Sequence, residues 1–207
     1  MGNHSRYRCV LAVLGFLTGF WAVQPCMALV ISEVMYHPHE DFGDVEFVEL
    51  YNDRAVTEDV GGYTFSNGVQ YTFPAGTMIG PKQYLVVSED PAALDAAYST
   101  TGTLGPYSGK LDNGGERIEL SNSNGQILIS FRYNDKHPWP ASPDGAGHSL
   151  ILARLGGDPE EGSTWLPSTF IGGTPGAPDE IQVGPEDPSL VDIIALGHAG
   201  RYFKGTE

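Results

Sequence analysis

The chain has 207 residues, of which 11 are Lys or Arg and 26 are Asp or Glu, so its formal net charge is −15. This length allows one medium-sized domain, or one domain and part of another. A chain of this charge repels nucleic acid and anionic lipid, because binding to either begins with neutralisation of phosphate, and we therefore exclude both as partners.

Residues 1–28 have the three parts of a signal peptide. Arg6 and Arg8 form a short positive region, an uncharged apolar run follows over residues 9–23, and the small residue Ala28 stands at the expected cut. The apolar run is too short to span a bilayer comfortably. We therefore expect cleavage after Ala28, a secreted or cell-surface product, and no stable membrane insertion of the mature chain.

Two alternatives to cleavage are an uncleaved membrane anchor and a lipoprotein modified at Cys26, although Pro25 is unfavourable just before a lipidated Cys. Cleavage would remove Arg6, Arg8 and both cysteines, leaving 9 Lys and Arg against 26 Asp and Glu, a net charge of −17. A secreted domain without disulfides must be stabilised by its core, and the remaining chain is long enough to bury one.

The first half of the mature chain has a series of strand patterns. Val30–Met35 is an apolar strand, and Val45–Asn52 carries apolar side chains on both faces, which indicates an interior strand. Asn67-Gly68, between the aromatic-rich segments 63–65 and 69–73, predicts a β-hairpin because both turn residues tolerate positive φ. Tyr84–Ser88 is a further strand.

The second half adds one helix and more strands. Pro91–Tyr98 predicts a short surface helix, since Pro suits the first turn. Residues 117–120 and 126–133 form a second hairpin, in which Ile127, Ile129, Phe131 and Tyr133 share one face. Ser149–Ala153 is the last clear strand. Short strands separated by turns predict an all-β sandwich or barrel.

After residue 180 the chain becomes acidic and rich in Pro and Gly, as linkers are. Leu190–Leu196 then begins a new apolar strand. We interpret residues 29–180 as one domain, and residues 181–207 as a linker and the truncated start of a second β domain. The alternative is a terminal strand that pairs back on the first domain.

Several blocks of the sequence follow the order found in bacterial lamin tail domains. They are Ile31–Pro38, Glu46–Asn52, Gly62–Phe65, Asn67-Gly68, Tyr71–Gly76, Leu111–Glu116, Pro138–Pro140, Asp144–Leu150 and Gly173–Gly176. Residues 29–178 therefore resemble the lamin tail domain, which implies an immunoglobulin-like β-sandwich with one short surface helix.

The resemblance does not carry over a nuclear role, because a signal peptide stands where the rod of nuclear lamins would be. In secreted bacterial proteins the domain resembles an accessory module beside other domains. The end of the chain, Arg201–Gly205, is similar to the opening of a second β domain in such proteins. The family has no established catalytic residues, so none can be transferred.

The most polar segment lies between His37 and Glu46. Asp41, Asp44 and Glu46 are candidate Ca²⁺ ligands, because hard carboxylates close together suit this ion. Their spacing lacks the regularity of an EF-hand loop, and an acidic loop in such a chain is commonly just solvated. His37 and His39 are alternative Zn²⁺ ligands, but no third ligand stands out. We expect no cofactor, with calcium as the alternative.

Three further positions invite a functional interpretation. Glu49 lies in an apolar strand, where a carboxylate needs a partner, so we expect an Arg or a turn amide beside it. His148-Ser149 lacks the Gly-x-Ser-x-Gly pattern of a nucleophile elbow. Trp139, between two prolines, is either an exposed ligand surface for sugars or a plug over the end of the sandwich, and the plug is the interpretation we favour.

These patterns predict a non-catalytic binding module of a secreted or cell-surface protein, whose partner is a protein or a glycan at the cell surface. Two alternatives stay open. One is an accessory domain of an extracellular enzyme whose catalytic domain lies beyond Glu207, and the other is a calcium-stabilised structural domain. Paired catalytic carboxylates and a nucleophile with its base are not recognisable in the sequence, so we expect no enzymatic activity.

Overall fold

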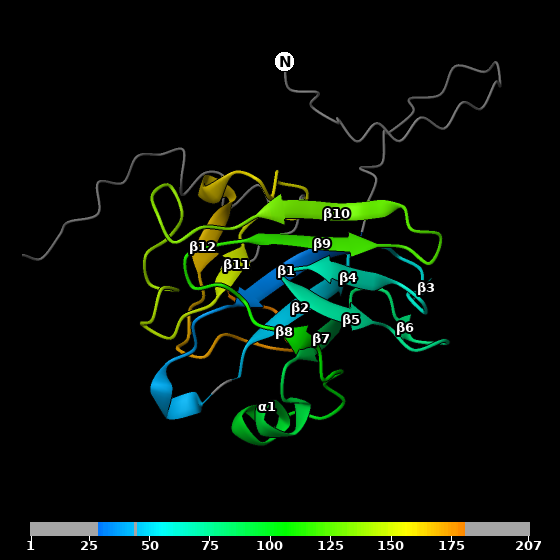
Figure 1. The fold of residues 1–207 in the computed structure, drawn as a ribbon, viewed down its shortest axis with the longest axis horizontal. Helices are drawn as coiled ribbons and strands as arrows, with labels where there is room; N and C mark the ends of the chain where they lie inside the picture. Colours follow the sequence, from blue (N-terminus) through cyan, green and yellow to red (C-terminus); the bar gives the residue numbers. More distant parts are fainter. Residues whose placement is uncertain (1–28, 44, 181–207) are drawn as a thin grey trace, which may run out of the picture.

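The computed structural model describes residues 29–43 and 45–180, which form two five-stranded sheets, a two-stranded ribbon and one α-helix (Figure 1). The first sheet has the strand order β12-β11-β1-β2-β7, and all its neighbouring strands are antiparallel. Its strands are β1 (Leu29–Met35), β2 (Phe47–Asn52), β7 (Tyr84–Ser88), β11 (Leu150–Leu152) and β12 (Trp165–Pro167).

The second sheet lies against the first and has the order β10-β9-β4-β5-β8, again antiparallel throughout (Figure 1). Its strands are β4 (Thr64–Asn67), β5 (Val69–Thr72), β8 (Ser108–Gly109), β9 (Arg117–Ser121) and β10 (Ile127–Arg132). The ribbon consists of β3 (Glu58–Asp59) and β6 (Met78–Ile79). Two short 3₁₀ helices, Glu40–Phe42 and Gly162–Thr164, lie in the connections.

The main core lies between the two sheets. β2 contributes Val48 and Leu50 from the first sheet, and β9 contributes Ile118 and Leu120 from the second. All four side chains are fully buried. This arrangement of two packed antiparallel sheets is the predicted immunoglobulin-like β-sandwich.

The outer face of the first sheet is also covered, because the helix α1 (Pro91–Tyr98) packs on it. Leu94 of α1 joins Met35 and Phe47 in a second apolar cluster. Every residue of β2 is therefore buried, those on one face by the second sheet and those on the other by the outer cover. The predicted interior position of this strand is confirmed.

Several local predictions match the structure. β7 and α1 have the expected bounds. β4 and β5 form the expected hairpin, in which Phe65 is paired with Tyr71 and Gly68 has a φ of +76°. Asp90 caps α1 by accepting a hydrogen bond from the backbone N–H of Ala93, at 3.0 Å. These elements form because their turn and cap residues act locally.

Two strand predictions were wrong. The segment 149–153 is not the last strand, because β12 follows and pairs with β11. Ile127 does not share the buried face of Ile129 and Phe131. An irregularity in the β9–β10 register between Ile127 and Ile129 turns Ile127 outward, where it is 48% exposed. The predicted signal peptide and the predicted second domain lie outside the described residues.

Candidate binding site

The buried carboxyl predicted at position 49 takes part in a structural hydrogen-bond network. One oxygen of Glu49 accepts a hydrogen bond from the backbone N–H of Gly176 at 2.7 Å, and the other lies 2.6 Å from the Ser32 hydroxyl. Of the two expected partners of Glu49, an Arg or a turn amide, the structure shows the turn amide. Burial, and next the charge of Glu33, raise the pKa of Glu49 well above its usual range.

Glu33 is a second buried carboxyl, which the sequence analysis missed. It stands directly opposite Glu49 in the β1–β2 register. It accepts hydrogen bonds from the Thr174 backbone N–H, at 3.0 Å, and from the Ser149 hydroxyl. The signal that marked Glu49, an acidic residue within an apolar strand, is present at Glu33 too and would have found it.

Glu46, one of the calcium candidates, also holds a loop. Its Oε2 accepts hydrogen bonds from the Leu111 N–H at 2.9 Å and from the Tyr107 hydroxyl at 3.2 Å. Burial raises the pKa of Glu46. Of the other candidates, Asp44 lies outside the described residues and the side chain of Asp41 is not described. Over the described ranges, no three or more His, Cys, Asp or Glu side chains are placed to hold a metal ion.

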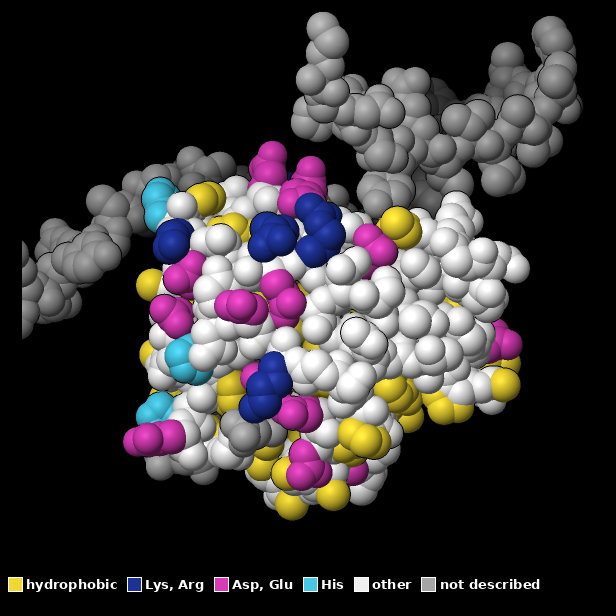
Figure 2. Space-filling view, in the orientation of Figure 1, with side chains coloured by type: hydrophobic (Ala, Val, Ile, Leu, Met, Phe, Trp, Pro, Cys, Tyr) yellow, Lys and Arg dark blue, Asp and Glu magenta, His cyan; other side chains and the backbone are white. Residues whose placement is uncertain are grey.

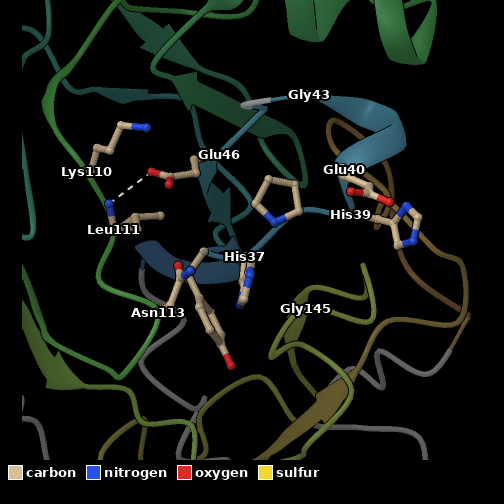
Figure 3. Close-up of a pocket in the computed structure, with 11 residues that line it drawn as sticks. His37, His39, Glu40, Gly43, Glu46, Lys110, Leu111, Asn113 and Gly145 are labelled. Atoms are coloured by element: carbon tan, nitrogen blue, oxygen red, sulfur yellow. Dashed lines mark hydrogen bonds between the residues drawn. The ribbon is translucent and has the colours of Figure 1, made fainter.

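A polar cleft of about 880 Å³ lies beside Glu46, and its walls come from three separate segments of the chain. Figure 3 shows Lys110, Leu111 and Asn113 on one side, His37 in the middle, and His39 with Glu40 on the other side. The lining side chains that carry its chemistry are Tyr36, His37, His39, Glu40, Lys110 and Asn113. The cleft therefore offers hydrogen-bond donors and acceptors, and it contains side chains of both positive and negative charge.

Two of the lining side chains have notable hydrogen bonding. The Nδ1 of His37 lies 3.0 Å from the Asp144 carboxylate, which fixes the orientation of the imidazole ring. The hydroxyl of Tyr36, another lining residue, is buried and has no hydrogen-bond partner in the described part of the chain. Burial raises the pKa of Tyr36, so this hydroxyl stays protonated and is an unused donor.

An apolar rim borders the polar cleft on the side of His39. Phe170 and Ile171 are consecutive apolar residues, and they are 52% and 55% exposed. A Cβ atom built on Gly147 would lie 2.7 Å from the Cβ of His39 and 3.0 Å from the Cγ2 of Ile171, so Ile171 and the cleft residue His39 both lie beside Gly147. Exposed neighbouring apolar side chains beside polar groups are typical of interaction surfaces.

Trp139 does not provide a surface for ligand stacking. It is only 9% exposed, and its ring stacks on Trp165 with the centroids 6.0 Å apart. A Cβ atom on Gly162 would lie within 2.9 Å of the indole, so the ring is closely covered. The alternative of an exposed ligand surface at Trp139 is therefore wrong. Trp139 closes part of the core, as the plug interpretation describes.

His148 and Ser149 do not form a nucleophile and its base. The Nδ1 of His148 is hydrogen bonded to the Ser168 carbonyl at 2.8 Å, whereas the Ser149 hydroxyl donates to Glu33. Ser149 is also fully buried. His148 therefore links the start of β11 to the segment that follows β12, and the Ser149 hydroxyl links it to β1.

Charged side chains of both signs lie on the described surface (Figure 2), although acidic ones predominate in the sequence. On the face shown in Figure 2, acidic side chains are interspersed with Lys and Arg. The described residues include the ion pairs of Arg117 with Glu160, at 3.0 Å, and of Arg54 with Glu58, at 2.6 Å. Across the described residues, no helix combines the length and the apolar character needed to cross a bilayer.

Comparison with known families identifies a match. The model of the lamin tail domain matches residues 23–135, which is more than half of the chain. The match covers β1 through β10, so β11, β12 and the residues after β12 lie beyond it. No curated protein matches the sequence.

Proposed function

The chain belongs to the lamin tail domain family, and on that premise we propose that it is a non-catalytic binding module of a secreted or cell-surface protein. Domains of this immunoglobulin-like family generally serve in interactions and form a non-catalytic fold family. The observation that supports binding is the polar cleft with its apolar rim. Polar groups that converge on a cleft fix a ligand's orientation, while an adjacent apolar patch contributes affinity.

The hydrogen bonding of the acidic side chains supports a non-catalytic role. Glu33, Glu46 and Glu49 are each engaged with backbone amides, and Ser149 donates to Glu33. Groups held in this way are committed to structure rather than available to a substrate. We expect no turnover of ester, phosphoester or glycoside substrates. Activity that is lost on Ser149→Ala or Glu49→Gln would contradict this proposal.

Secretion is supported by the pattern of residues 1–28. Expression in a bacterial host and intact-mass measurement of the exported protein test it. We expect a chain that begins at Leu29, whereas an exported chain that still begins at Met1 would contradict cleavage after Ala28.

The binding proposal is tested by screening the full chain against cell-surface glycans and surface proteins, followed by variants of the cleft. Asn113→Ala removes a polar group of the cleft, and Ile171→Ala shortens the apolar rim. Each should weaken binding of a ligand found in the screen about tenfold, which corresponds to about 1.4 kcal/mol.

Matched controls carry the same kind of change elsewhere on the surface. Asn124→Ala lies in the β9–β10 turn, and Val56→Ala replaces a side chain that is 60% exposed. Both should leave the affinity within about twofold of the unmodified chain, because surface changes away from a site have little effect. A ligand whose binding is lost in these controls but kept in the cleft variants would place the binding surface elsewhere.

A further inference from the structure

The segment 168–179, which follows β12, closes the outer side of the first sheet, and we name it the closing strap. Ser168 and Gly172 donate backbone hydrogen bonds to the carbonyls of Ser149 and Gly147, at 2.9 and 2.6 Å. The Tyr98 hydroxyl of α1 donates to the Gly172 carbonyl at 2.6 Å. The strap thus joins β11 to the helix that covers the same face.

Two buried carboxyls hold the centre of the strap. Glu33 accepts the backbone N–H of Thr174, and Glu49 accepts the backbone N–H of Gly176. Both carboxyls are fully buried. Residues directly opposite one another in an antiparallel pair have Cβ atoms about 4.5–5.5 Å apart, so these two side chains share one site.

Neither carboxyl pairs with a Lys, Arg or His in the described part of the chain. The titratable groups that act on the pair are Asp179 on the strap, Tyr84 on β7 and Tyr98 on α1. All three are acids, so none of them offsets the negative charge. Two facing carboxylates without a cation cannot both ionise readily in a dry site.

The site can hold a proton without losing its bonds to the strap. The Ser32 hydroxyl lies 2.6 Å from Oε1 of Glu49 and 3.4 Å from the Glu49 backbone carbonyl. If Oε1 carries a proton, it donates to Ser32, whose own hydrogen turns to the backbone carbonyl. Oε2 then still accepts the N–H of Gly176.

We propose that Glu33 and Glu49 form a proton-sensitive lock, which keeps the closing strap in place while the pair holds a proton and loosens it when both carboxyls ionise. Desolvation raises the pKa of Glu33 to about 7, and the pKa of Glu49 is also raised. The lock therefore operates near neutral pH and above. It also bears on the binding surface, since Phe170 and Ile171 belong to the strap.

Hydrogen–deuterium exchange of the strap in the full chain tests the lock without a ligand, so its outcome is independent of the proposed binding function. After correction for the base-catalysed intrinsic rate, exchange at Thr174 and Gly176 should rise at least about tenfold between pH 6 and pH 8, because opening releases a proton. Exchange that does not change over this range would overturn the lock.

The double variant Glu33→Gln, Glu49→Gln removes both titrating groups while keeping oxygen acceptors for the two amides. Its corrected exchange in the strap should vary less than about twofold over the same range. Glu46→Gln, which changes a buried carboxyl that bonds Leu111 instead of the strap, should keep the original pH dependence. A slope that persists in the double variant, or that vanishes in Glu46→Gln, contradicts the assignment.

Carboxyl ¹³C shifts of the unmodified chain provide a readout that needs no variant. At least one of the two Glu carboxyls should titrate at or above neutral pH, about two units or more above an exposed Glu. If both carboxyls titrate near pH 4, the pair holds no proton at pH 6 and the proposal fails.

Discussion

Several buried polar side chains in this domain hydrogen bond with backbone groups of other segments. The amide of Asn52, at the end of β2, donates to the carbonyls of Val56, Ile79 and Gly80 at 2.8, 2.9 and 3.0 Å. Its carbonyl accepts the N–H of Arg54 at 2.9 Å. One fully buried side chain thus holds the loop after β2 and the chain after β6 in place.

Replacement of this side chain should therefore be costly. Asn52→Ala removes the donor to three backbone carbonyls, of which that of Ile79 is buried and the other two are part-buried, so we expect the free energy of unfolding to fall by about 2–4 kcal/mol. Urea denaturation measures the change. The same substitution at the exposed residue Asn124 should stay within about 0.5 kcal/mol. Equal effects at the two positions would show that the hydrogen bonds of Asn52 are not stabilising.

The residues of the candidate site were only partly predictable. A carboxylate inside an apolar strand is unusual by itself, and this identified Glu49. The cleft joins residues near 37, 110 and 145, which no local pattern connects. The closing block 173–176 was recognised as a marker of the family, but its bonds to Glu33 and Glu49 depend on tertiary pairing.

Elements were predictable where their signals are local. The Asn67-Gly68 hairpin, β7 and α1 are specified by turn residues, alternation and caps within each segment. The short strands were not, and they are β3, β6, β8 and β12. Each has only two or three residues, so it becomes a strand through the partner that it meets in space.

The helix offers a test at the scale of one element. Asp90→Ala removes the acceptor for the Ala93 N–H, and should lower the free energy of unfolding by about 1 kcal/mol. The rate of hydrogen exchange within α1 should increase in the same variant. Asp90→Asn keeps a capping oxygen and should retain most of the stability. If Asp90→Asn were as destabilising as Asp90→Ala, the charge at this position rather than the cap would be responsible.

The stability of the whole molecule should depend on pH in a defined direction. Burial raises the pKa values of Glu33, Glu46, Glu49 and Glu116 in the folded state. Between the ordinary Glu pKa and these raised values, the folded chain binds more protons than the unfolded chain. The free energy of unfolding therefore falls as pH rises, from about pH 5 to about pH 8.

Urea denaturation at several pH values checks this trend. Glu33→Gln should flatten part of it, because this carboxyl has a folded-state pKa of about 7. Stability that rises steadily from pH 5 to pH 8 would mean that these carboxyls are ionised and favourably solvated in the folded state, contrary to their burial.

At the end of the domain, Asp179 is the last residue with a clear structural role among those described. It is 3% exposed, and its carboxylate accepts hydrogen bonds from the Thr169 N–H at 2.8 Å and the Thr169 hydroxyl at 2.6 Å. These bonds fasten the end of the closing strap to its beginning. They place the stabilising contacts of the strap on the N-terminal side of residue 180.

A pair of truncations tests the domain boundary. Removal of residues 181–207 should leave the melting temperature unchanged within error and improve solubility, because an apolar segment such as Leu190–Leu196, predicted from sequence to be a strand, favours aggregation when it has no partner. Removal of residues 178–207 takes Asp179 as well, and should lower the melting temperature because the Thr169 amide loses its acceptor. A loss of several kcal/mol in the first truncation would instead make residues 190–196 a strand of this sandwich, and the boundary at residue 180 would be wrong.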